Sequence, residues 1–272
     1  MSSVLLFLTY PQIPLKNTKI YATLWSPQTK EPIMANRLNE EQRQRVLEYM
    51  DLGILQRLDG NRLQNGAGTL IWLCGDADQH PHIFREHRVA WRDHHVGHTD
   101  YAARLHVKTN NGGPVLLDPE HLLLSNFFPG GDVVRYHLLD IISSCVLKGI
   151  HTIALCPHVV CGLETSVCGR DMDDTFTSVV RTKYLLKSMM RNPEFMAWVM
   201  SVMGAVNPLS EEAITFAKGL SDTIKVSIFT QFDFGPNDIV GKDRFSLFLS
   251  AEAWREYKNL PPYTHTIHIP TL

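Results

Sequence analysis

Short apolar runs alternate with amphipathic stretches along much of this chain. Residues 69–73 and 150–155 are mostly apolar and are bounded by Gly or polar residues, which predicts two strands buried on both faces. Between these runs, residues 133–146 place apolar side chains three and four positions apart and lead into Lys148-Gly149, which predicts a helix. The alternation of strand and helix predicts a parallel sheet with right-handed crossovers.

The same patterns predict further elements on both sides of this core. A helix capped by Asn39 precedes it, and helices interrupted by Pro193 and Pro208 follow it. Further strands are expected at 115–117 or 122–124, 225–229, 245–249 and, at the sheet edge, 263–272, with a short helix at 251–257. The expected fold is one α/β domain, residues 1–272, with a parallel-sheet core and flanking helices. It comprises a Pro-rich N-terminal arm (1–38), a core (39–170) and a C-terminal helical and strand extension packed on the core (171–272).

Composition narrows the class of protein. Of the 272 residues, 44% are hydrophobic and 20% charged, as in ordinary globular proteins, and the net charge of -2 offers no basic excess for nucleic acid or an anionic membrane. Residues 4–8 are apolar but too few to span a bilayer, so we interpret them as a strand or packing arm, with a weak signal peptide as the alternative. The five cysteines are an odd, sparse set, which argues against a disulfide scaffold and for a reducing, cytoplasmic location.

Metal-type side chains directly follow both buried runs. Cys74 comes after the first run, and His158 and Cys161 come shortly after the second. Because the carboxyl ends of parallel strands meet at one edge of a sheet, these side chains are expected to lie close together. Two thiolates and an imidazole suit Zn²⁺, and a fourth position is left for Asp76, water or substrate. The alternative is that they are buried packing side chains at a strand end.

Other chemistry-bearing residues have simpler interpretations. Cys156 fits core packing, whereas Cys168 lies near enough to the second motif to substitute for a ligand. The segment 80–106 is rich in histidine and arginine, and a solvated polar face is its preferred interpretation. The acidic cluster that begins at Asp171 fits a helix N-terminus better than a calcium loop. The Met-rich residues 189–203 fit a core or a partner groove.

The two ligand motifs together resemble a known family. The order Cys74-Gly75-Asp76, helix, strand, then His158-Val159-Val160-Cys161-Gly162 is similar to the β-class carbonic anhydrases, which carry Cys-x-Asp-x-Arg after one strand and His-x-x-Cys-Gly after a later one. Residues 126–155 also resemble the loop, helix and strand before the family's second motif. The resemblance covers residues 69–168. It implies a β-carbonic-anhydrase-like fold, zinc held by Cys74, His158 and Cys161, and a homodimer or higher homo-oligomer.

The resemblance also implies an activity, from which this chain departs in part. It implies a zinc lyase or hydrolase that hydrates carbon dioxide, or a related small electrophile, through zinc-bound hydroxide oriented by Asp76. The family's arginine after that aspartate is Asp78 here, its Arg-Asn pair is Ser125-Asn126, and the ligand spacing of 158 − 74 = 84 residues is longer than usual. Without that arginine, Asp76 can bind the metal and block water. The alternative is therefore a non-catalytic relative with structural zinc and a binding role.

Overall fold

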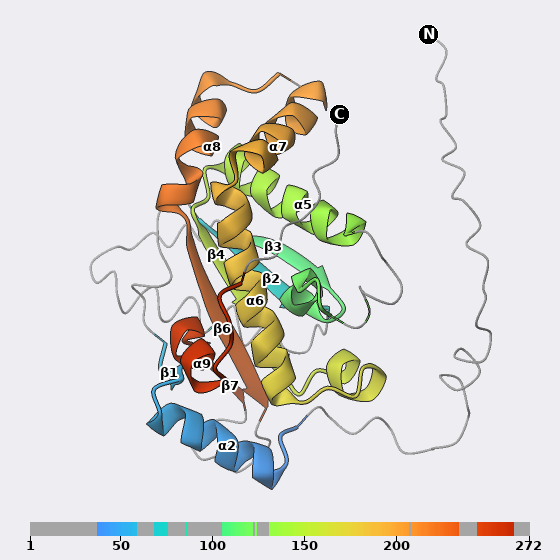
Figure 1. Cartoon of the computed structure of the whole chain (residues 1–272), viewed down its shortest axis with the longest axis vertical. Helices are drawn as coiled ribbons and strands as arrows, with labels where there is room; N and C mark the ends of the chain where they lie inside the picture. The colour runs from blue at the N-terminus through green and yellow to red at the C-terminus, as the bar shows by residue number, and fades with distance from the viewer. Residues whose placement is uncertain are drawn as a thin grey trace, which may run out of the picture. The chain divides into compact units, whose positions relative to one another are not determined.

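The chain builds a mixed sheet in the part that the structure describes. The computed structural model describes residues 37–58, 68–75, 85, 105–121, 123, 131–206, 208–233 and 244–263. The sheet order is β1-β7-β6-β4-β2-β3, and β5 pairs with β6 beyond the end of β4 (Figure 1). The strands are β1 (Leu55–Gln56), β2 (Thr69–Cys74), β3 (Leu105–Asn110), β4 (Thr152–Cys156), β5 (His158–Val159), β6 (Lys225–Asp233) and β7 (Arg244–Leu249).

Most strand pairs are parallel, as the sequence predicts. β2 runs parallel to β3 and β4, and β6 runs parallel to β4 and β5. On the other side of β6, β7 pairs antiparallel with β6, and β1 pairs antiparallel with β7. Leu73 pairs with Cys156 of β4, so β2 and β4 end at nearly the same level of the sheet. This register brings the segments that follow the two strands to one edge, where ligands collect in α/β proteins.

The described helices share one core with the sheet, and Figure 1 shows α5 and α6 crossing the sheet on the same side. Leu70 and Trp72 pack among the helices, whereas Ile71 and Leu73 face a smaller apolar cluster on the opposite side, because successive side chains of a strand alternate. Among the described helices, none combines the length and apolarity that crossing a bilayer requires. They are α2 (Glu40–Asp51), α5 (Asp132–Lys148), α6 (Met172–Arg191), α7 (Pro193–Val206), α8 (Glu211–Thr223) and α9 (Ala251–Tyr257).

Local signals explain where these helices begin and end. Asn39 and Asp171 each form a capping box at the start of α2 and α6, so the acidic cluster at Asp171 is a helix N-terminus. Gly149 adopts φ 63° and closes α5, a left-handed position that favours glycine.

The strand predicted at 115–117 is wrong, and its alternative, 122–124, lies mostly outside the described residues. Residues 115–117 belong to the 3₁₀ helix η3 (Gly113–Leu117), and Leu123 is helical while its neighbours lie outside the described residues. Residues 115–117 are apolar because η3 is buried against α6, where the Thr182 hydroxyl donates a 2.9 Å hydrogen bond to the Pro114 carbonyl. The strand, β3, lies instead at the end of the His-rich segment 80–106 and runs on to Asn110. The N-terminal arm up to residue 36, Asp76 and residues 264–272 of the expected edge strand lie outside the described residues.

Candidate metal centre

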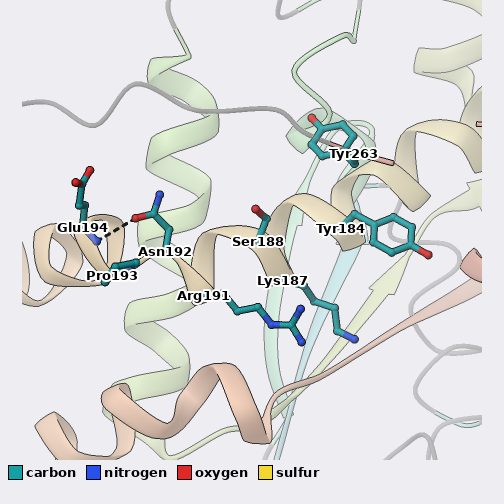
Figure 2. Close-up of a pocket in the computed structure, with 8 residues that line it drawn as sticks. All are labelled: Tyr184, Lys187, Ser188, Arg191, Asn192, Pro193, Glu194 and Tyr263. Carbon is teal, nitrogen blue, oxygen red and sulfur yellow. Dashed lines mark hydrogen bonds between the residues drawn. The ribbon is translucent and has the colours of Figure 1, made fainter. Parts of the chain in front are cut away.

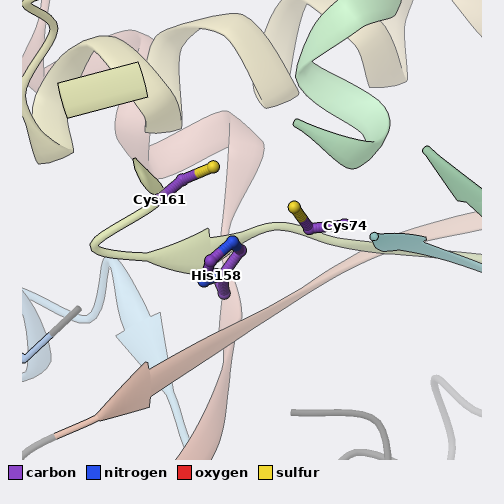
Figure 3. A group of neighbouring side chains, drawn as sticks. All are labelled: Cys74, His158 and Cys161. Carbon is purple, nitrogen blue, oxygen red and sulfur yellow. The ribbon is translucent and has the colours of Figure 1, made fainter. Parts of the chain in front are cut away.

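The structure brings together Cys74, His158 and Cys161. One ligand atom from each side chain lies within 4.8 Å of the others, and all three side chains are buried. Figure 3 shows the two sulfur atoms pointing toward each other, with the imidazole beside them. Two thiols and an imidazole in this arrangement are able to hold a metal ion with three protein ligands.

Strand pairing fixes the segments that carry these three side chains. Cys74 is the last residue of β2, one position beyond the pairing of Leu73 with β4. After β4 the chain leaves its pairing with β2 and continues along β6 as β5, where His158 pairs with Gln231. The Gln231 amide donates a 3.0 Å hydrogen bond to the Pro157 carbonyl. The backbone at His158 is thereby held by the continuing sheet, and Cys161 follows three residues later.

A glycine pair presses against Cys74. The Gly112 amide donates to the Cys74 sulfur over 3.3 Å, and the contact is buried. Gly112 and Gly113 have φ of 81° and 59°, and a Cβ at Gly113 would lie 2.7 Å from the Cys74 nitrogen. Only glycine fits this close approach without displacing the backbone. A backbone N–H directed at sulfur stabilises the thiolate form that binds metals.

Backbone amides also donate to Cys161, but the neighbouring Cys74 thiol has the larger effect on its pKa. The amides of Leu163 and Glu164, at the start of the π-helical turn η4 (Leu163–Val167), donate to Cys161 and lower its pKa. The hydrogen bond with the Cys74 thiol, together with burial, outweighs them and raises the pKa of Cys161 well above its usual range. Two buried thiols this close cannot both ionise without a compensating charge, and a divalent cation supplies that charge. The donor set therefore fits a metal ion.

A second group of metal-type side chains lies next to this site. His121, Glu164 and Cys168 also offer ligand atoms within 4.8 Å of one another. Here the Leu123 amide donates to His121 Nδ1 over 3.3 Å, so Nε2 carries the proton and donates to Glu164 Oε1 over 2.7 Å. The other carboxylate oxygen lies 3.2 Å from the Arg170 guanidinium. The carboxylate charge is thus already neutralised within the protein.

This second group extends into α6 through a chain of hydrogen bonds. Arg170 Nη2 donates to the Ser178 hydroxyl over 2.6 Å, and this hydroxyl donates to the buried Asp118 carboxylate over 2.6 Å. Arg181 lies 3.6 Å from the same carboxylate. Burial raises the pKa of Asp118 despite the hydrogen bond from Ser178. The network ties η4, which carries the donors to Cys161, to α6, the longest of the described helices.

Other cysteines that the sequence singled out have different roles. Cys156 is buried in the smaller apolar cluster on the opposite side of the sheet, as its core interpretation requires. Cys168 belongs to the second group. Asp76, Asp78, Ser125-Asn126 and most of the His-rich segment lie outside the described residues.

Sequence reasoning missed several residues that shape the site. The turn at Gly112-Gly113 was visible as a Gly-Gly-Pro sequence, but nothing local indicated its contact with Cys74. Glu164, three residues after Cys161, was the available signal for the second group. His121 carried no pattern that would have identified it.

Comparison with known proteins gives no relative for this chain, so the geometry of the site is the basis for its chemistry. No protein-family model matches the chain, and neither does any curated protein or solved structure. The observations that stand are an α/β fold with a mostly parallel sheet and a buried Cys₂His group able to hold a metal ion.

Proposed function

We propose that this protein is a zinc-dependent lyase or hydrolase that resembles the β-class carbonic anhydrases. Its expected substrate is carbon dioxide, bicarbonate or a related small electrophile. The observation that carries the proposal is the buried cluster of Cys74, His158 and Cys161, assembled from the carboxyl ends of neighbouring parallel strands. A Cys₂His set in the order of the two sequence motifs is the ligand set that the resemblance implies.

Zinc is the proposed ion because two thiolates and one imidazole are soft and borderline ligands that suit it in tetrahedral geometry. When bound, it supplies a Lewis acid that lowers the pKa of a water to about 7. Cys74 and Cys161 balance the charge of the ion, and the amides of Gly112, Leu163 and Glu164 hold their sulfur atoms. Asp76, two residues after Cys74, is the carboxylate proposed to orient the attacking water.

Stopped-flow hydration of carbon dioxide by the zinc-loaded full chain tests this function. We expect turnover that rises with pH toward the pKa of the bound water and disappears in Cys161→Ser. Asp76→Asn is expected to retain zinc by elemental analysis but to lose most of the turnover. Zinc-loaded protein that turns over neither carbon dioxide nor carbonyl sulfide or carbon disulfide at any pH would refute catalysis.

A specific sequence feature favours a second candidate function, in which zinc is structural and the protein binds a partner. Asp78 stands where the family has the arginine that pairs with its aspartate. Two carboxylates near each other repel and cannot replace that pairing. Under this candidate, Asp76→Asn weakens zinc binding, because Asp76 is then a fourth ligand. Under the catalytic candidate, zinc affinity stays unchanged.

A further inference from the structure

An apolar cavity lies away from the metal centre, between the end of α6 and the helices α7 and α8. Its volume is about 620 Å³, within the range of small-molecule sites. The apolar lining includes Met190, Met196, Met200, Leu209 and Ile214. Unbranched thioether side chains adapt to irregular apolar ligands, so this lining suits a flexible hydrocarbon better than a rigid ring system.

A more polar pocket adjoins this cavity at the end of α6. Its volume is about 710 Å³, and it shares Arg191 and Pro193 with the apolar cavity. Figure 2 shows Lys187 and Arg191, one helical turn apart, extending from the same side of α6. Asn192 accepts hydrogen bonds from the Glu194 and Phe195 amides at 3.0 and 3.1 Å, so it serves as the cap of α7. Because Arg191 lines both pockets, it is the cation at their junction.

The charges around this junction are mostly positive. Lys187 and Arg191 line the polar pocket, Lys218 lines the apolar cavity, and Glu194 is the acidic residue among their described linings. Lys187 lies near Glu252, but that carboxylate already pairs with Lys183 at 3.2 Å. The ion pairs within the described part of the chain do not engage Arg191 or Lys218. An anion at the mouth of the apolar cavity is thus favoured.

We propose that these joined pockets bind an amphiphilic carboxylate, such as a medium-chain fatty acid. The acyl chain lies in the Met-lined cavity between α6, α7 and α8. The carboxylate meets Arg191, whose guanidinium accommodates it with two parallel hydrogen bonds. The site requires an apolar tail and an anionic head on one small molecule, which matches an apolar cavity that opens beside a cationic pocket.

Isothermal titration calorimetry of the full chain with dodecanoate, below its micelle concentration, tests the proposal. We expect saturable binding of about one molecule per chain. Each methylene removed, through decanoate to octanoate, is expected to weaken binding roughly fourfold. 1-Dodecanol, which has the tail without the charge, is expected to bind about tenfold more weakly because it lacks the charge-assisted hydrogen bonds. Metal removal should leave this binding unchanged, so the result is independent of the function proposed above.

Two substitutions at exposed positions separate head from tail, and a third at an exposed position serves as the control. Arg191→Gln is expected to weaken dodecanoate about tenfold while leaving 1-dodecanol unchanged. Ala197→Phe, whose side chain lines the cavity, is expected to fill it and weaken both ligands. The control Lys225→Gln, at the start of β6, is expected to change neither. Because all three side chains are exposed, circular dichroism should show wild-type folding.

Two outcomes would overturn the proposal. The first is no saturable binding of dodecanoate, or binding that is indifferent to chain length and to Arg191→Gln. The second is a homodimer in analytical ultracentrifugation that Ala197→Phe disrupts and dodecanoate does not, which would show that a second copy of the chain covers this cavity.

Discussion

Two clusters of metal-type side chains adjoin η4, which carries Glu164 of the second cluster, and they differ in how their charge is balanced. In the Cys74, His158 and Cys161 cluster, two thiols face each other, and their ionised forms would repel. In the His121, Glu164 and Cys168 cluster, the carboxylate already pairs with a guanidinium and a protonated imidazole nitrogen. Both are groups of three possible ligands within 4.8 Å of one another, and all six side chains except Cys168 are buried, yet only the first leaves a role for a divalent cation.

The difference shows that proximity of ligand atoms alone does not define a metal site. A buried carboxylate that is neutralised within the protein gains little from a cation and would have to give up its pairing to bind one. The neutralised cluster instead has a structural role, because it anchors Glu164, whose backbone amide donates to Cys161. We therefore regard the second cluster as the support of the first.

Substituting one cysteine in each cluster should give the largest difference, in the amount of bound zinc. Cys161→Ser should reduce bound zinc from about one per chain to near zero, because two remaining ligands do not hold the ion. Cys168→Ser should leave the content at about one. Inductively coupled plasma mass spectrometry of dialysed protein measures both. Equal losses in the two variants would erase the distinction between the clusters.

A second substitution tests the structural role of the neutralised cluster. Glu164→Gln leaves the largely buried Arg170 without its counter-charge, and we expect a loss of about 3–5 kcal/mol in the free energy of unfolding, measured with urea. The exposed control Glu256→Gln should change it by less than about 0.5 kcal/mol. If Glu164→Gln were as mild as its control, the His121, Glu164 and Arg170 network would not support the site.

A pair of glycine substitutions tests the contact behind Cys74. Gly113→Ala places a Cβ 2.7 Å from the Cys74 nitrogen, whereas Gly149→Ala, at a similar positive φ, meets nothing within 4 Å. We expect Gly149→Ala to cost about 1 kcal/mol through backbone strain alone and Gly113→Ala to cost more. Gly113→Ala should also weaken zinc binding roughly 10- to 100-fold by moving the Gly112 donor. Competition with a colorimetric chelator measures the affinity, and equal affinities in both variants would contradict this role.

A third imidazole, that of His137, should have the smallest effect, on how stability depends on pH. His137 packs beside Trp72, and burial, followed by the charge of Lys108, lowers its pKa from 6.5 to about 4, with Asp140 opposing the shift. Between these values the unfolded chain binds more protons, so His137 makes stability fall as the pH drops from about 6.5 to 4. His137→Gln should make that fall shallower, as urea midpoints at pH 7 and pH 5 would show. An unchanged pH dependence would mean that His137 is not held neutral by its surroundings.

The buried parts of the fold were predictable from the sequence because their apolar patterns are continuous. β2 and β4 are covered on both faces, and the metal-type residues follow them directly in sequence. β3 was missed because its pattern is inverted. Val107 is 41% exposed, whereas Lys108 points inward to pair with Asp140 and Asn110 accepts a hydrogen bond from Trp72. An edge strand whose inward side chains are polar gives no apolar signal.

The supporting cluster was beyond prediction for a different reason. His121 and Glu164 are 43 positions apart and are brought together only in the folded arrangement of the segments that follow η3 and β5. Neither residue lies in a periodic segment, and their pairing depends on loop conformations that no spacing rule specifies. The contact of Gly113 with Cys74 depends in the same way on the turn after β3.

X-ray absorption spectroscopy at the zinc edge of the reconstituted full chain is the sharpest test of whether Cys74, His158 and Cys161 hold the ion. We expect two sulfur ligands at about 2.3 Å and one imidazole nitrogen at about 2.0–2.1 Å, with one sulfur lost in any Cys161→Ser protein that retains zinc. A zinc shell of nitrogen and oxygen ligands without sulfur would contradict this expectation.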